Sequence, residues 1–470
     1  MPQENVQATT SVNQEQMSVP PVLPQQPPAI PPPPKKTFPK FIIYGIAGLL
    51  VIVVLVVIGK MFFSKKTSSV ANITWWGLWE DQATVSSLIS SYESSHPNVK
   101  INYIRQSPQD YRERLTSAMA KGNGPDIFRF HNTWIPMFRN DLDSLPASVM
   151  NAADFAKTFY PIASSDLTSG TGIVGVPLEY DALVLYINED IFNKSGKNPP
   201  GTWDELRVLS RELTVKDDQN SITQSGVALG RTENVDHWPE IIALLMLQNG
   251  VDLTNPIGKP AEDALTFFTV FSTVDGVWDE TLPGSTIAFA SGKLAMYIGP
   301  SWRSFEISQQ NPNLKFKTVP IPQLPKDNPS QADITYATYW AEGVWSKSTK
   351  KAASWEFLKF LTTQDSLQKF YESATKVRTF GEPYPRQDMA SILKDHPILG
   401  SIIKQAPGAQ SWYLASRTFD GPTGINTQLS NYFGDAINTL VENKDTAEKA
   451  MQTVAAGVLQ VLGQYRLIAK

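Results

Sequence analysis

The chain of 470 residues contains no cysteine and only four histidines, and its net charge of −4 is close to neutral. The absence of cysteine excludes disulfide bonds, thiolate catalysis and zinc sites with cysteine ligands. The four histidines are scattered, and neither an HExxH nor a GxSxG motif occurs. The balanced charge also provides no basic footprint for a nucleic acid. We therefore expect no nucleic-acid partner, no metal and no cofactor.

Proline and one long apolar run dominate the N-terminal part of the chain. Residues 1–40 are rich in proline and glutamine, a composition that cannot bury a core and predicts a disordered tail. Phe41–Gly59 lacks any charge and, as a helix, would span about 28 Å, close to a bilayer core of roughly 30 Å. We expect one uncleaved transmembrane anchor over residues 41–63 and a polar linker over 64–72. Lysines flank the run on both sides and do not orient it.

Strand and helix patterns alternate after the linker and predict an α/β lobe with a largely parallel sheet. Strands are expected at 73–76, 99–104 and 126–128, with helices at 80–91 and 110–121 between them. Ligands of such sheets bind beyond the carboxyl ends of the strands. The candidate binding residues at these ends are Trp76, Trp79, His131, Asn132 and Trp134. For Trp76 and Trp79, the pattern is equally consistent with core packing.

A polar triplet, Glu179-Tyr180-Asp181, lies between two apolar segments that each resemble a strand. Pro177 ends the first segment and cannot donate a hydrogen bond within a central ladder. One interpretation is a hinge strand that leaves one lobe and enters a second, with the triplet facing the cleft between them. The other is a surface turn with two solvated carboxylates.

Six short motifs follow one another along the chain: Trp75–Glu80, Gly122–Ile127, Gly175–Pro177 with Leu185–Asn188, Asn198–Leu206, Phe289–Met296 and Lys351–Leu361. In this order they resemble the extracellular solute-binding proteins of ABC importers, family 1, the maltodextrin-binding-protein-like group. The resemblance extends from about residue 73 to the C-terminus. It implies a type II periplasmic-binding-protein-like fold with two α/β lobes joined by a hinge. Lobe 1 would contain residues 73–180 and about 333–378, and lobe 2 residues 181–332 and about 379–470.

The resemblance also implies a function. A non-enzymatic receptor would close around a small solute, a mono- or oligosaccharide, and pass it to ABC permease subunits. The large C-terminal part would lie outside the cytoplasm. The membrane helix would replace the cleaved signal or lipidated cysteine that is usual in the family, and the proline-rich tail would be cytoplasmic.

Further ligand-binding candidates follow from the resemblance. It places Glu233 and Trp238 near the sugar, and it places an aromatic platform at Trp302, just past a strand end. Trp340 and Trp412 lie in segments that could also face the cleft. For Trp238 and Trp340, packing in the core is an equally good interpretation.

Two other classes of function remain as alternatives. A glycoside hydrolase could use Glu179 and Asp181, but carboxylates two residues apart on one strand point to one wall, whereas a hydrolase needs carboxylates flanking the bond. A surface adhesion or sensor module would explain the proline-rich tail but not the cleft motifs. We expect no catalytic residue.

Overall fold

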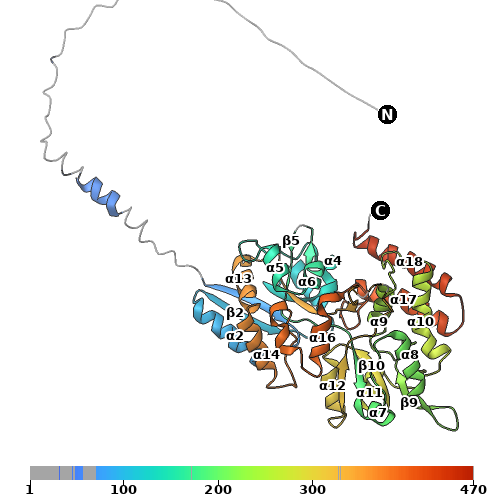
Figure 1. Cartoon of the computed structure of the whole chain (residues 1–470). Coiled ribbons are helices and arrows are strands. Elements are labelled where there is room, and N and C mark those ends of the chain that lie inside the picture. The colour runs from blue at the N-terminus through green and yellow to red at the C-terminus, as the bar shows by residue number, and fades with distance from the viewer. Residues whose placement is uncertain are drawn as a thin grey trace, which may run out of the picture. The chain divides into compact units, whose positions relative to one another are not determined.

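The computed structural model describes residues 70–170, 172–326, 328 and 330–468, together with Pro31, Gly45 and residues 48–56. Most of the predicted tail, part of the predicted anchor and residues 64–69 of the predicted linker lie outside the described residues. No helix within the described ranges is long and apolar enough to cross a membrane. The chain divides into two units, 1–68 and 69–470, and the second contains all the sheets (Figure 1).

The first of two five-stranded sheets is built mainly from the N-terminal part of the second unit. β1 runs parallel to both β2 and β3, as predicted, whereas β13 runs antiparallel to its two neighbours, β3 and the edge strand β6. β1 begins at Ala71, which pairs with Val99, so the predicted linker is two residues too long. In spatial order the strands are β2 (Val99–Arg105), β1 (Ala71–Gly77), β3 (Ile127–His131), β13 (Trp340–Val344) and β6 (Val176–Pro177).

Helices from two distant parts of the chain cover this sheet. In α2 the carboxylate of Asp81 accepts the backbone N–H of Thr84, and an apolar stripe that includes Val85 and Leu88 is buried. Trp75 is buried, as predicted, and lies edge-on to Phe357 of α13. The helices are α2 (Gln82–Ser95), α3 (Tyr111–Ala120), η1 (Asn132–Trp134), α4 (Ile135–Phe138), α5 (Ala152–Thr158), α6 (Pro161–Asp166), α13 (Lys351–Leu361) and α14 (Gln364–Ala374).

The second sheet contains two strands that the sequence interpretation missed. These strands, β8 and β9, lie in the segment 213–230, which is rich in turn-forming residues. β9 is held by parallel pairing with β10, and a Cβ on Gly226 would lie 2.0 Å from the carbonyl oxygen of Ser210. Tertiary packing therefore overrides the weak local preference of this segment. The strands are, in spatial order, β11 (Phe316–Val319), β7 (Val184–Asn188), β10 (Leu294–Gly299), β9 (Ile222–Val227) and β8 (Val215–Lys216).

The helices near the second sheet begin largely where expected. Thr202 and Glu205 form the predicted capping box of α8, each satisfying a backbone N–H of the other. After Gln405 the chain is mostly irregular up to residue 424. The helices are α7 (Glu189–Ser195), α8 (Trp203–Glu212), α9 (Trp238–Gln248), α10 (Lys259–Thr273), α11 (Ser285–Ala290), α12 (Arg303–Gln310), η2 (Gln387–Met389), α15 (Ala390–Leu393), α16 (Leu399–Gln405), η3 (Ala406–Gly408), α17 (Ile425–Val441) and α18 (Ala447–Gln464).

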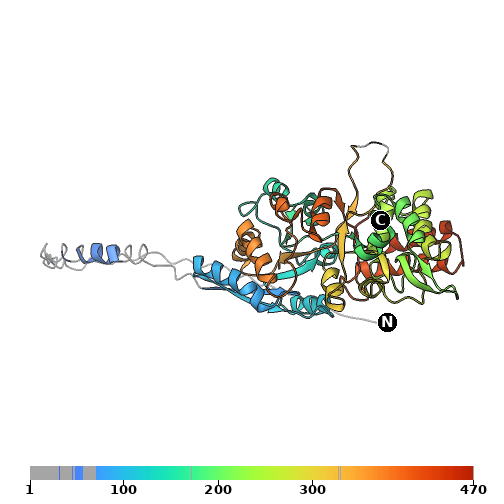
Figure 2. The same ribbon diagram turned by 60° about the horizontal axis from the view of Figure 1, so that its bottom comes forward.

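The chain passes between the two sheets more than once. It leaves the first sheet after β6 and enters the second at β7, and it returns between β11 and β13. Figure 2 shows the two groups of elements and the segments that run between them. Residues at these crossings are therefore brought close to both sheets. The smaller pairs are β4 (Thr168–Ser169) with β5 (Gly172–Ile173) and β12 (Thr335–Tyr336) with β14 (Ala409–Gln410).

Candidate functional site

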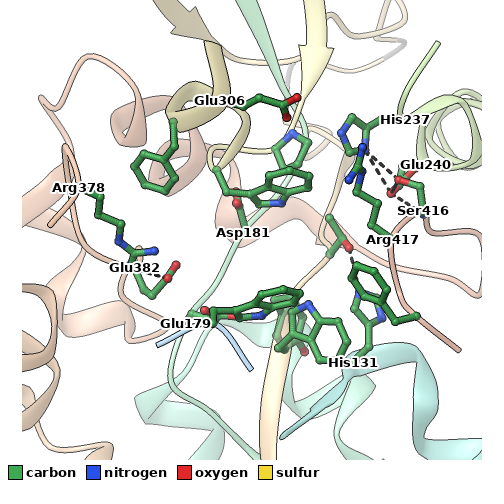
Figure 3. A pocket seen from close by; sticks show the side chains of 18 of the residues that line it. His131, Glu179, Asp181, His237, Glu240, Glu306, Arg378, Glu382, Ser416 and Arg417 are labelled. Carbon is green, nitrogen blue, oxygen red and sulfur yellow. Dashed lines mark hydrogen bonds and ion pairs between the residues drawn. The ribbon is translucent and has the colours of Figure 1, made fainter. Parts of the chain in front are cut away.

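A cavity of about 390 Å³ lies where residues near both sheets meet. This volume falls in the range of roughly 300–1,000 Å³ that is usual for small-molecule sites. Aromatic and charged side chains both line it (Figure 3). Six of the residues that the sequence singled out line this cavity: Trp79, His131, Glu179, Asp181, Trp302 and Trp340.

Three of the remaining candidates are buried beside the cavity without lining it. Asn132 donates a hydrogen bond of 2.9 Å to Asp166. Trp134 is fully buried, and its ring lies edge-on to Trp340 at 5.4 Å between centroids. Tyr180 is buried among other tyrosines. Trp134 thus supports a cavity residue from behind.

The other four candidates lie further from the cavity. Trp76 and Trp412 are half-buried against the core. Glu233 forms an ion pair with a neighbouring arginine. Trp238, at the start of α9, lines a second cavity of about 290 Å³ together with residues 415–421. The structure therefore does not bring these four into the main cavity.

Several cavity residues were not found from the sequence. Arg378 and Glu382 lie close to the lobe boundary expected at about residues 378 and 379, and that prediction could have drawn attention to them. Others lie in the irregular segment before α17, where the sequence has no helical or strand periodicity that would indicate which side chains face the cavity. The further lining residues are His237, Glu240, Pro300, Phe305, Glu306, Gln309, Thr338, Tyr339, Arg378, Glu382, Ser416, Arg417 and Phe419.

The segment with Arg417 and Phe419 has an unusual backbone. Their φ angles of 53° and 52° are left-handed, a conformation that costs roughly 1–2 kcal/mol per residue with a side chain. The segment places the Phe419 ring 5.9 Å from Trp79 and the Arg417 guanidinium 5.9 Å from the ring of Trp302. It therefore contacts aromatic side chains associated with both sheets.

At one end of the cavity, here called the paired end, His237, Arg303, Glu240 and Ser416 form a buried network. Arg303 Nε donates to His237 Nε2 at 2.9 Å, so Nε2 is the acceptor and the ring proton is on Nδ1. Nδ1 lies 3.0 Å from Ser416 Oγ, which itself donates to Glu240 at 2.8 Å. Burial lowers the pKa of His237, and the neutral ring fits this bonding pattern.

The serine, histidine and glutamate of the paired end do not form a hydrolytic triad. In such a triad the serine contacts one ring nitrogen and the carboxylate contacts the other. Here Ser416 and Glu240 both lie on the Nδ1 side, and Arg303 occupies Nε2. His237 therefore has no nitrogen available to take a proton from Ser416.

The same network fixes Trp302. This residue lies between the end of β10 and the start of α12, as the sequence predicted. The guanidinium of Arg303 lies 4.5 Å from the centroid of the indole, and the ring of His237 meets it edge-on at 5.7 Å. The contacts with Arg303 and His237 thus hold the indole in place, and the indole also forms part of the cavity wall.

At the opposite end, Arg129 of β3 joins two glutamates below the cavity. Its guanidinium donates to both oxygens of Glu80, at 2.8 and 2.9 Å, and to Glu342 at 2.8 Å. Glu342 also accepts from the indole of Trp75 at 3.0 Å. Burial raises the pKa of Glu342 to about 7. One guanidinium is thus shared by two buried carboxyl groups.

Glu179 lies above this group. It forms, with Glu80, Glu382 and Arg378, what we call the carboxylate end. One oxygen from each of the three glutamates lies within 4.8 Å of the others. Arg378 donates to Glu382 at 2.6 Å, whereas Glu179 has no hydrogen bond or ion pair among the described residues. Burial, and then the charge of Glu382, raise the pKa of Glu179 well above its usual value. The two guanidiniums already occupy Glu80 and Glu382, which disfavours a metal ion here.

Asp181 connects the two sheets. Its carboxylate accepts the backbone N–H of Ser301 at 3.1 Å and the hydroxyl of the same residue at 2.8 Å. Burial raises the pKa of Asp181 to about 7, although the bonds from Ser301 oppose this. The carboxylate is 8% exposed, so the interpretation of the triplet as a solvated surface turn is wrong.

His131 lies on the first-sheet side of the cavity, at the end of β3. Its two ring nitrogens lie 2.8 Å from Thr133 Oγ1 and 3.0 Å from Thr338 Oγ1. Burial lowers the pKa of His131 to about 3, so the ring is neutral. It meets Trp340 edge-on at 5.1 Å and orients that indole.

A family comparison identifies this architecture. The family of bacterial extracellular solute-binding proteins matches residues 76–367 of the chain. The chain belongs to this family. A putative binding protein of Brucella abortus is 24% identical over 298 residues, which cover 60% of this chain and 69% of that protein. The predicted family is thereby confirmed.

Solved structures share the fold of this family member. An ABC transporter solute-binding protein of Thermotoga lettingae, bound to α-D-tagatose, superposes with a TM-score of 0.63 at 22% identity, covering 84% of this chain and 100% of that one. The sugar-binding protein MalE of Xanthomonas citri gives 0.67 at 17% identity, covering 84% and 98%. The predicted α/β periplasmic-binding-protein-like fold is confirmed.

Proposed function

We propose that this solute-binding protein captures a carbohydrate outside the cytoplasm and delivers it to the permease of an ABC importer. One observation carries the proposal: aromatic side chains near both sheets line the same cavity. Trp79 and Trp340 come from the first-sheet side, and Trp302 and Phe305 from the second. Aromatic faces pack on the apolar faces of sugar rings, while carboxylates accept hydrogen bonds from hydroxyl groups.

The structural relatives support this class of ligand, since the Thermotoga protein is described with a ketohexose and the Xanthomonas protein as sugar-binding. The sequence lacks a GxxxxGK[ST] phosphate loop, so transport would need a separate ATPase. The permease subunits would contact the outer surface of the closed receptor. Catalysis forms no part of the proposal.

Closure of the cavity would follow from the crossings between the sheets. We take the first sheet as the core of one lobe (73–180 and about 333–378) and the second as the core of the other (181–332 and about 379–470). Several crossings form a hinge, and hinge closure around a ligand is the expected motion. Addition of the ligand should therefore reduce the radius of gyration in solution scattering. An unchanged radius at saturating ligand would contradict closure.

Anchoring in the membrane is a separate part of the proposal and rests on the apolar run Phe41–Gly59. Protease added to intact cells should degrade the part after Lys66 and leave the tail before Lys40 intact. Protection of the large C-terminal part would contradict the single-pass, extracytoplasmic arrangement. Its degradation together with the tail would contradict the cytoplasmic position of the tail.

A panel of sugars tests the function directly. The compact unit of residues 69–470 should gain thermal stability with at least one mono- or oligosaccharide and should release no product from it. A hydrolase would instead liberate shorter sugars, and Glu179→Gln or Asp181→Asn would abolish that release. The absence of a shift with every sugar would reject the carbohydrate class.

A further inference from the structure

We propose that the carbohydrate bound here carries a protonated amino group, which Glu179 and Glu382 hold at the carboxylate end of the cavity. The inference rests on the proposed function and narrows it from sugars in general to amino sugars.

Glu179 differs from the other carboxylates that line the cavity in its hydrogen bonding. Asp181 accepts from Ser301, Glu240 from Ser416, Glu306 from Arg303 and Glu382 from Arg378. Only Glu179, among the five carboxylates that line the cavity within the described residues, has no partner. It is nevertheless only 7% exposed. A buried carboxylate without a donor is costly, and because Glu179 lines the cavity, a ligand there can supply the donor.

The charges around Glu179 do not balance. The charged groups that face it come from the loop after β1, from β3 and from the crossing after α14. Arg129 is already shared by Glu80 and Glu342, and Arg378 is bound to Glu382. Four carboxyl groups therefore meet two guanidiniums. The groups concerned are Glu80, Glu179, Glu342 and Glu382, with Arg129 and Arg378.

A neutral hydroxyl would give Glu179 a donor but would leave the excess negative charge in place. An ammonium group offers three N–H donors and a positive charge at one atom. Glu179 and Glu382 have oxygens within 4.8 Å of each other, close enough for one ammonium to donate to both. Charge-assisted bonds of this kind are roughly twice as strong as neutral ones. The geometry and the charge thus favour the same group.

The unliganded protein relieves the excess charge differently. Burial and Glu382 raise the pKa of Glu179, which favours its protonated form when the cavity holds no cation. An ammonium ligand replaces this proton, which is released to the buffer. A neutral sugar has no such effect. Proton release on binding is therefore a second signature that is independent of affinity.

Titration calorimetry with three matched disaccharides tests the inference. The β-1,4-linked glucosamine dimer, its N,N′-diacetyl form and cellobiose differ only in the substituent at C2. The full-length protein is used at pH 6, in a detergent without a sugar headgroup. The diamine should bind at least about ten-fold more tightly than the other two, with a heat that depends on the ionisation enthalpy of the buffer.

Two variants assign the effect to Glu179. In Glu179→Gln the preference for the diamine should disappear, because the amide keeps the shape but not the charge, while cellobiose should bind within about two-fold of its wild-type affinity. Glu448→Gln makes the same change on the exposed face of α18 and should leave all three affinities unchanged. Loss of the diamine preference in both variants would contradict a local role.

The remaining outcomes each overturn the inference, and they do so in distinguishable ways. Equal or tighter binding of cellobiose or the diacetyl form leaves the proposed function intact. Binding of Ca²⁺ or Mg²⁺ alone, lost in Glu179→Gln, would identify a metal site. Binding of spermidine without any sugar would reject the carbohydrate class as well. If none of the three disaccharides binds, the amino-sugar inference fails, and the wider sugar panel decides the function separately.

Discussion

The two ends of the cavity, on the left and right of Figure 3, are built from similar residues but differ in how their charges are satisfied. At the paired end, Glu240 accepts two hydrogen bonds from Ser416, and His237 accepts one from Arg303. At the carboxylate end, Glu179 accepts none among the described residues. Each charged side chain of the paired end thus has at least one partner within the described part of the protein, although Glu240 Oε2 and Arg303 Nη2 make no hydrogen bond there, whereas Glu179 has no partner at all.

This difference indicates what each end contributes. The paired end holds its groups in one arrangement before a ligand arrives, so it can position Trp302 without a further ordering cost. The carboxylate end retains an unsatisfied group, which is a cost to the unliganded fold and a source of affinity for the right ligand. Stability and recognition should therefore respond in opposite ways to mutations at the two ends.

The largest effect should come from breaking the paired end. His237→Ala leaves the Nε–H of Arg303 and the carboxylate of Glu240 with fewer partners in a buried place, and we expect a loss of about 3 kcal/mol in the free energy of unfolding. Urea denaturation of residues 69–470 would measure it. His96→Ala removes an exposed histidine at the end of α2 and serves as the control, with a loss below about 1 kcal/mol. Similar losses in the two variants would show that the network contributes little.

Removal of the aromatic wall should affect binding more than stability. Truncating a buried aromatic anchor commonly costs about 2 kcal/mol, or roughly thirty-fold in the dissociation constant. We expect this loss for Trp302→Ala, with a nearly unchanged melting temperature of the unliganded protein. Trp412→Ala, at a half-buried tryptophan outside the cavity, should bind normally. If Trp302→Ala unfolds early and its folded fraction binds normally, the indole is a packing residue.

The position of the cavity could be predicted from the sequence to a useful extent. Side chains after the carboxyl ends of strands, such as Trp79 and Trp302, do line it. The same rule also selected Trp134, which is buried in the layer behind, because strand position does not determine how deep a side chain lies. On the first-sheet side, Trp79 and Trp340 accordingly line the cavity, whereas the candidates Trp76 and Trp134 do not.

Other parts of the site were beyond sequence reasoning. Ser416, Arg417 and Phe419 lie in an irregular segment without a period, and the left-handed backbone at the last two is not a common choice for such residues. The missed strand β9 depends on its pairing with β10. The sequence also could not show that Glu179 lacks a partner among the described residues, because this depends on which carboxylates Arg129 and Arg378 bind in the folded chain.

The smallest predicted effect is a change in the stability of the unliganded protein when Glu179 is replaced. Its sign is opposite to that at the paired end, because this replacement should stabilise the protein. Burial raises the pKa of Glu179 in the folded protein above the usual value of 4.5. The folded state therefore binds more protons than the unfolded state once the pH exceeds about 4.5, and stability falls as the pH rises toward the raised pKa. Glu179→Gln removes this dependence. Near pH 4 the free energies of unfolding of the variant and the wild type should differ only by a constant offset. As the pH increases, the variant should become more stable relative to the wild type.

At pH 8 we expect the unliganded Glu179→Gln variant to be more stable than the wild type by about 1 kcal/mol, which corresponds to a rise of about 1–3 °C in melting temperature. Thermal unfolding of both proteins from pH 4 to pH 8 measures the difference. A saturating amino sugar should reverse the order, since it stabilises only the protein that retains the carboxylate. A difference that is independent of pH would mean that Glu179 keeps its charge in the unliganded protein. The charged form of Glu179 would then be favoured without a ligand, as that of Glu240 is, and the contrast between the two ends would not hold.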